Sequence, residues 1–104
     1  MKKDFTGVFY FERTTNSNLL GEFSNNESKI IMTESAIASG DTNDFEGDYT
    51  TTWFDFQVNG MNMKIKRTGN KYEITWLDKD EIPIFKGEGF LAGNKLIGFY
   101  KKTL

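Results

Sequence analysis

Three dipeptides, Asn59-Gly60, Gly69-Asn70 and Gly93-Asn94, each lie between runs of alternating apolar and polar residues. Two-residue turns of this composition tolerate positive φ and join antiparallel strands into tight hairpins. Each turn also sets which residues face each other, because a slip of one position moves every side chain to the other face of the sheet. The chain is therefore predicted to fold mainly as an antiparallel meander.

The turn at Asn59-Gly60 would pair the strand before it with residues 61–68. It sets Phe54 opposite Ile65 and Phe56 opposite Met63. These four residues are apolar and fall on one face, which is the pattern of a strand with one buried side. This predicts that Phe54 and Met63 point to the interior.

The turn at Gly69-Asn70 continues the same face across the next strand. It sets Met63 opposite Trp76 and Arg67 opposite Tyr72. Two separate turn signals thus agree on one register, which a one-residue slip would break. A three-stranded meander is predicted for this part of the chain.

The opposite face of this meander carries charges in cross-strand pairs. The basic side chains in question are Lys64, Lys66, Arg67 and Lys71. Lys64 would lie opposite Asp55, and Lys66 opposite Glu73. Opposed charges stabilise a sheet by about 0.2–1 kcal/mol per pair. A solvated outer face with cross-strand partners therefore explains two of the four basic residues, Lys64 and Lys66, and is favoured over a nucleic-acid-binding patch. With a net charge of −2, no nucleic-acid or membrane partner is expected.

The turn at Gly93-Asn94 brings glycines together in the last two strands. It sets Gly89 opposite Gly98 and Gly87 opposite Tyr100. A patch without side chains lets the ribbon coil sharply and lets a bulky ring lie on the backbone. We therefore predict an all-β fold, an antiparallel up-and-down meander closing into a small barrel of about eight strands, with little or no helix. Residues 1–104 form a single domain, and residues 28–39 fit either a strand or a short helix.

The outer face of these strands is also apolar. Phe90, Ile97 and Phe99 share it, and Val8 and Tyr10 give the first strand a similar second apolar side. Strands that are apolar on both faces are normally buried on both. Either a partner covers this face, as in a homodimer or an adaptor that binds another protein, or the inner and outer faces of these strands are the reverse of those predicted.

The stretches "FTGVFYF" and "YEITWLDKDEIPIFKGEGFLAGNKLIGFY" resemble the opening and closing strands of the calycin group, the lipocalin-like and avidin-like barrels. The resemblance implies an up-and-down barrel architecture and leaves the ligand open. Avidin-type biotin sites use several tryptophans, whereas this chain has only Trp53 and Trp76, which the predicted register sets on opposite faces. No biotin-binding residues are therefore predicted in this chain.

Several chemistries are excluded by composition. The chain has no Cys and no His, which removes thiolate nucleophiles, thiolate zinc sites and the commonest general base. The acidic residues from Asp41 to Asp48 do not follow the EF-hand pattern, so no metal or other cofactor is expected. Glu88 is a candidate acid or base, but no second carboxylate accompanies it. No signal peptide is readable, which favours a cytoplasmic protein and leaves a mature secreted domain open.

The function that these observations favour is a non-enzymatic small β-barrel that binds a small apolar or aromatic ligand in its interior. The residues predicted to bind the ligand are Phe54, Met63, Arg67, Tyr72, Trp76 and Tyr100. Arg67 would stand at the rim and hold an anionic group. The alternatives left open are the homodimer or adaptor, with Phe90, Ile97 and Phe99 as its interface, and an enzyme using carboxylate, Lys or Tyr chemistry.

Overall fold

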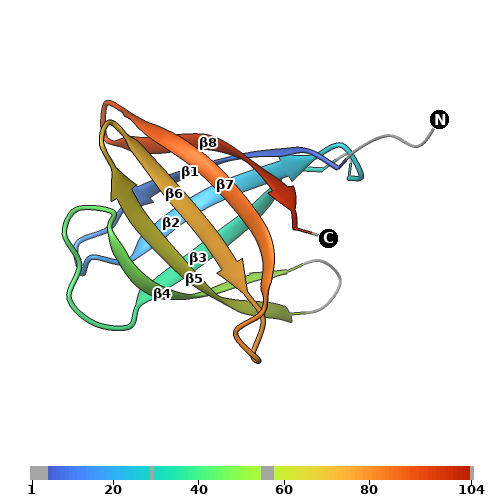
Figure 1. Ribbon diagram of the computed structural model, residues 1–104, viewed down its shortest axis with the longest axis horizontal. Helices are drawn as coiled ribbons and strands as arrows, with labels where there is room; N and C mark the ends of the chain where they lie inside the picture. Colours follow the sequence, from blue (N-terminus) through green and yellow to red (C-terminus); the bar gives the residue numbers. More distant parts are fainter. Residues whose placement is uncertain (1–4, 29, 55–57, 104) are drawn as a thin grey trace.

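The computed structural model describes residues 5–28, 30–54 and 58–103, without the side chains at positions 54 and 58. The strands are β1 (Gly7–Arg13), β2 (Leu19–Asn25), β3 (Met32–Ala38), β4 (Gly47–Phe54), β5 (Val58–Thr68), β6 (Lys71–Leu77), β7 (Pro83–Ala92) and β8 (Lys95–Lys102). Each strand pairs antiparallel with the next, and β8 pairs with β1 to close the barrel (Figure 1). The described residues form no helix. The predicted fold class is confirmed, and β3 shows that residues 32–38 form a strand.

The two Gly-Asn turns form as predicted. Gly69 and Gly93 each have a φ of 65°, a conformation that costs glycine little because it has no Cβ. The strands that these turns join keep the predicted register, so Met63 lies opposite Trp76. Turn chemistry and alternation were thus sufficient to predict the pairing of β5 with β6 and of β7 with β8.

The predicted turn at Asn59-Gly60 is wrong, because both residues lie within β5. Gly60 lies opposite Thr52 in the ladder between β4 and β5, and neither Asn59 nor Gly60 has a positive φ. The predicted pairing of Phe56 with Met63 falls outside the described residues. A turn preference is local, and here the longer ladder and the packing of the closed barrel override it.

This change of register reverses the face that β4 turns toward the barrel axis. The two registers differ by an odd number of positions, and side chains alternate along a strand. Tyr49 and Thr51 are buried as a result, and Trp53 faces the interior. Trp53 and Trp76, predicted on opposite faces, therefore both point inward. The side chain of Phe54 lies outside the described residues.

The outer face of the meander keeps its opposed charges with one change of partner. Lys66 lies opposite Glu73 as predicted. Lys64 lies opposite Asp48 instead of Asp55, because the ladder between β4 and β5 has moved. The basic side chains thus retain acidic cross-strand neighbours, which is the arrangement of a solvated face.

Glycines allow a close approach between strands, including at the β7–β8 pair. A Cβ on Gly98 would overlap the carbonyl oxygen of Glu88 on β7, and a Cβ on Gly7 would overlap the ring of Tyr100. A Cβ on Gly87 would lie 3.4 Å from the ring of Phe9. Aromatic rings therefore lie on bare backbone, as the glycine pattern predicted.

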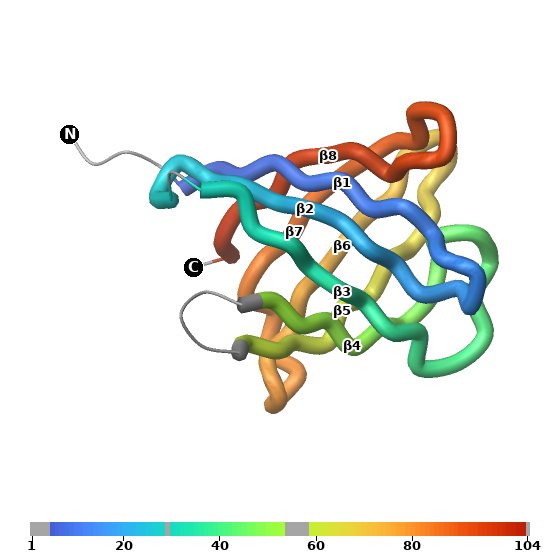
Figure 2. The backbone as a smooth tube through the Cα atoms, turned by 180° about the vertical axis from the view of Figure 1, so that it is seen from behind, coloured from blue at the N-terminus to red at the C-terminus, as the bar shows by residue number. Residues whose placement is uncertain are grey.

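Side chains fill one half of the barrel. The fully buried set includes Phe11, Leu19, Tyr49, Met63, Ile74 and Leu96. At the closed end, the loop between β3 and β4 folds over the interior, where the Tyr49 hydroxyl donates a hydrogen bond to the Phe45 carbonyl at 2.8 Å. The opposite end, where the β2–β3 and β6–β7 connections lie (Figure 2), is hereafter the open end.

Candidate functional site

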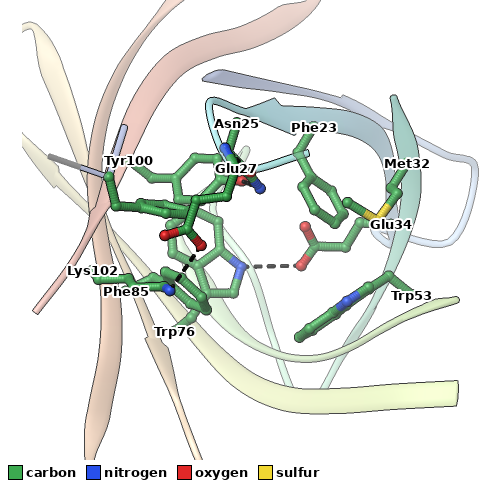
Figure 3. Close-up of a pocket in the computed structure, with 11 residues that line it drawn as sticks. Phe23, Asn25, Glu27, Met32, Glu34, Trp53, Trp76, Phe85, Tyr100 and Lys102 are labelled. Carbon is green, nitrogen blue, oxygen red and sulfur yellow. Dashed lines mark hydrogen bonds and ion pairs between the residues drawn. The ribbon is translucent and has the colours of Figure 1, made fainter. Parts of the chain in front are cut away.

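A cavity of about 220 Å³ occupies the open end of the barrel. Its aromatic lining consists of Phe5, Phe23, Trp53, Trp76, Phe85 and Tyr100. The remaining lining residues are Asn25, Glu27, Met32, Glu34 and Lys102 (Figure 3). This space is hereafter the aromatic cavity. Small barrels either fill their interior or leave room for one small ligand; this barrel is packed in one half and leaves a cavity in the other.

Tyr100 packs against several of the other aromatic rings that line the cavity. Its ring centroid lies 5.6 Å from that of Trp76 and 5.7 Å from that of Phe85. The Asn25 side-chain amide donates a hydrogen bond to the Tyr100 hydroxyl at 3.2 Å. Burial raises the pKa of that hydroxyl, with a smaller contribution from the charge of Glu34, while the Asn25 hydrogen bond opposes the shift. The Tyr100 side chain is thus neutral, and its contacts fix its position in the cavity lining.

Phe23 and Trp53 form the side of the cavity nearest β3. Their ring centroids lie 6.1 Å apart with the planes at 87°, the edge-to-face geometry that aromatic pairs favour. Both side chains are only half-buried, so ring surface remains free toward the cavity. A ligand entering the open end would contact these two rings.

Glu34 is the one buried carboxylate among the described residues, with 4% of its surface exposed. It projects from β3 into the aromatic cavity, where the Trp76 indole N–H donates a hydrogen bond to Oε2 at 3.0 Å (Figure 3). Burial raises the pKa of Glu34 to about 7, and the Trp76 hydrogen bond opposes that shift. The nearby Thr51 hydroxyl also lowers the pKa, although it makes no hydrogen bond of good geometry.

The second oxygen of this carboxylate, Oε1, has no hydrogen-bond partner in the described part of the chain. No described cation pairs with Glu34 either. Lys102, the cation at the cavity rim, pairs with Glu27 at 3.1 Å and lies 4.7 Å above the Phe5 ring. The aromatic cavity therefore contains a buried acid whose free oxygen and charge are uncompensated by the described residues.

The structure distributes the sequence-predicted ligand-binding residues over both halves of the barrel. Trp76 and Tyr100 line the aromatic cavity. Met63 and Tyr72 are buried in the packed core, and Phe54 lies outside the described residues. These predicted residues do not form one site.

Arg67 lies at the closed end, beside the β5–β6 turn. Its backbone N–H donates to the Glu46 carboxylate at 3.0 Å, and its Nε donates to the Gly69 carbonyl at 3.1 Å. The side chain is exposed and does not line the aromatic cavity.

The predicted interface residues lie on the outer surface. Phe90 is 56% exposed and Phe99 47% exposed, and Ile97 is also exposed. In the sheet, Val8 lies opposite Phe99 and Ile97 opposite Phe90. These four side chains, hereafter the outer apolar patch, span β1, β8 and β7.

Sequence reasoning missed Glu34, Trp53 and Phe23. The signal for Glu34 was the alternation in "MTESAIA", which places Met32, Glu34 and Ala36 on one face of a strand. That alternation could not identify Glu34 as an inward-facing residue, because residues 28–39 fitted a short helix as well as a strand. Trp53 was assigned to the wrong face by the incorrect turn.

Other candidate chemistries find no support in the described residues. No group of three or more acidic side chains there is placed to hold a metal ion. Glu88 is partly exposed and pairs with Lys71 at 3.7 Å, as expected for a surface carboxylate. The described residues include no helix of sufficient length and hydrophobicity to cross a membrane.

Fold and cavity together define a small closed antiparallel barrel with an aromatic-lined pocket at one end, an architecture consistent with a calycin-like fold. No protein-family model, curated protein or solved structure matches the chain.

Proposed function

We propose that this protein is a non-enzymatic barrel that binds a small apolar or aromatic ligand in its aromatic cavity. The observation that carries the proposal is the contrast between the two halves of the interior. One half is packed with buried side chains, whereas the other leaves about 220 Å³ between aromatic rings. Interiors are normally close-packed, and concave apolar sites with a few polar groups are typical of ligand binding.

Binding fits the cavity better than catalysis does. Acid–base catalysis generally needs two groups placed against the substrate. Glu34 is the only buried acid among the described residues that line the cavity, and Lys102 pairs with Glu27 at the rim. A single carboxylate surrounded by rings serves to orient a ligand.

The size of the cavity limits the ligand. Water occupies about 30 Å³ per molecule in the liquid, so 220 Å³ corresponds to about seven waters. A ligand with one ring and a short chain is of that size. Affinity for so small a molecule is expected between about 1 μM and 1 mM, given the usual free energy per ligand atom.

The proposal is tested with the two tryptophans, because both line the cavity and the chain has no others. Indole, phenethyl alcohol and phenethylamine are titrated while the indole N–H signals are followed by NMR and the emission by fluorescence. We expect saturable changes at both indoles, and Trp53→Ala should weaken binding at least about tenfold, since stacking aromatic residues dominate such sites. Native mass spectrometry of the purified protein should detect any retained small molecule.

Arg67→Ala is the matched control, because Arg67 is exposed at the closed end. It should leave the affinities unchanged. Non-saturating changes scattered over the surface, or equal losses in Trp53→Ala and Arg67→Ala, would remove the aromatic cavity as the binding site.

A second candidate function is self-association through the outer apolar patch. Val8 and Phe99 lie opposite each other there and are both about half exposed. Ion pairs between Lys95 and Glu12 and between Lys71 and Glu88 lie on the same three strands or beside them. Both signs of charge beside an apolar patch suit contact with a second copy of the same surface.

Sedimentation velocity over a concentration series tests this candidate. A dimer that Phe99→Asp dissociates, and that Ile37→Asp does not, would support it. Ile37 is an exposed apolar residue too, at 60% against 47% for Phe99, but lies on β3, outside the outer apolar patch. A wild-type protein that remains monomeric at millimolar concentration would eliminate self-association.

A further inference from the structure

The uncompensated carboxylate of Glu34 constrains the chemistry of the ligand. A buried charge is costly unless it is paired and hydrogen-bonded. Glu34 has 4% of its surface exposed, one hydrogen bond from a neutral indole and one free oxygen. Such an arrangement in a packed core would be a defect, but here the free oxygen borders a cavity large enough for a ligand.

Among the residues that the structure describes, the groups around Glu34 supply no unpaired positive charge. Its neighbours in the sheet, β2 and β4, present Phe23, Asn25, Thr51 and Trp53, none of which titrates near neutral pH. Trp76 on β6 is neutral as well. From β8 the titratable groups are Tyr100 and Lys102, and from the β2–β3 connection Glu27, which forms the ion pair with Lys102. The balance of the cavity is one negative charge when Glu34 is ionised.

The rings favour a cation in the same place. Aromatic faces attract ammonium groups that lie over the ring. Glu34 lies between Phe23 and Trp53 on one side and Trp76 on the other (Figure 3). A carboxylate within a set of rings binds an ammonium through an ion pair and the ring faces together, while the ligand's hydrocarbon part contacts the remaining rings.

We infer that the ligand of the aromatic cavity is a small organic cation, a primary or secondary ammonium on an apolar or aromatic body, with its N–H groups donating to Glu34 Oε1. This rests on the proposed function, because it names the ligand class of the same cavity. An anionic ligand would meet the charge of Glu34 in a poorly solvated site. A neutral ligand could be bound by the rings but would leave the carboxylate charge unpaired.

The experiment compares three probes of the same shape and different charge: phenethylamine, phenethyl alcohol and hydrocinnamate. Affinity is measured at about pH 8, where Glu34 is ionised and a primary amine is still protonated. The expected order is amine above alcohol above carboxylate. Glu34→Gln, which keeps an acceptor for the Trp76 N–H, should lower amine affinity about 10- to 100-fold, the range for lost charge-assisted hydrogen bonds, and leave alcohol affinity within about threefold.

Glu27→Gln is the matched control. It is the same substitution in the same cavity, but Glu27 is an exposed rim residue, so amine affinity should change by less than about threefold. The wild-type protein provides a second readout that needs no variant. Lowering the pH from about 8 to about 5.5 protonates Glu34 and should reduce amine affinity about tenfold or more, while alcohol affinity stays constant.

The outcomes separate this inference from the proposed function. If all three probes bind equally well and neither the pH nor Glu34→Gln alters the order, the ammonium assignment is overturned and the cavity remains a ligand site. If the alcohol binds and the amine does not, the assignment is overturned as well. If no probe perturbs Trp53 and Trp76, the proposed function fails, and the ligand class fails with it.

Discussion

Glu34→Gln should make the free protein more stable at alkaline pH and should remove most of the dependence of its stability on pH. The pKa of Glu34 is raised from 4.5 to about 7 because burial disfavours the charged carboxylate. A folded state with the higher pKa binds the proton more tightly than the unfolded state does. Its contribution to stability is therefore fully present below about pH 4.5 and is lost as the pH rises to about 7.

The size of the effect follows from the shift. One pKa unit corresponds to about 1.4 kcal/mol, so a rise from 4.5 to about 7 corresponds to about 3 kcal/mol. Most of this, about 2–3 kcal/mol, is lost between about pH 5 and pH 8. Since small domains have about 5–15 kcal/mol of stability, a fall in Tm of about 10 °C over that range is expected.

Urea unfolding, followed by tryptophan fluorescence and circular dichroism at half-unit pH steps, measures the effect. The sequence makes the comparison unusually clean, because His ordinarily titrates in this range and the chain has none. The difference between the wild type and Glu34→Gln isolates the contribution of one residue. An unchanged slope in the variant, or a variant that is less stable than the wild type at pH 8, would refute the assignment of a raised pKa to Glu34.

Three further predictions concern the fold. Gly98→Ala should destabilise the protein by about 1–3 kcal/mol, because its Cβ would overlap the Glu88 carbonyl. Gly60→Ala should be neutral or stabilising by up to about 1 kcal/mol, because its Cβ would lie 3.4 Å from the nearest atom. A loss of stability as large as that of Gly98→Ala would instead support a turn at Asn59-Gly60. Tyr49→Phe should cost about 0.5–1.5 kcal/mol, because its buried hydroxyl donates to Phe45, and a neutral result would show that bond to be weak. All three are measured by urea unfolding.

Local turn chemistry predicted two of the strand pairs in the second half of the barrel, β5 with β6 and β7 with β8. The strand pairs around Gly69 and Gly93 follow directly from positive φ at each glycine. The glycines of β7 and β8 indicated a curled sheet, and the close approach at Gly98 is its physical basis. In these strands local preference and global packing agree, which is the condition under which sequence reasoning succeeds.

The incorrect prediction of a turn at Asn59-Gly60 shows what local sequence patterns do not determine. Both registers keep Met61, Met63 and Ile65 on the inner face of β5, so the alternation within β5 could not distinguish them. Only the partner strand decides, and β4 must also pair with β3, where Trp53 lies opposite Glu34. Closure of the barrel is a non-local constraint that no window of sequence around a turn contains.

The candidate site depended on that error more than the fold did. Moving the β4–β5 ladder changed no element type, but it brought Trp53 to the face that Trp76 shares. It also placed the strand that carries Glu34 beside that ring. A binding site assembled from several strands changes when any one of the registers between those strands changes. A fold class stays the same when a single register changes.

Glu34 stands where a hydrophobic residue would stabilise the free barrel. Its neighbours on the inner face of β3, Met32 and Ala36, are both buried, and replacing a buried polar group by an apolar one of similar shape is often stabilising. Glu34→Met should therefore raise the unfolding free energy at pH 8 while abolishing the preference for amines over alcohols. A site that sacrifices stability for a specific contact is a common feature of function. If Glu34→Met is instead less stable than the wild type at pH 8, the carboxylate serves the fold, and the case for a cationic ligand is lost.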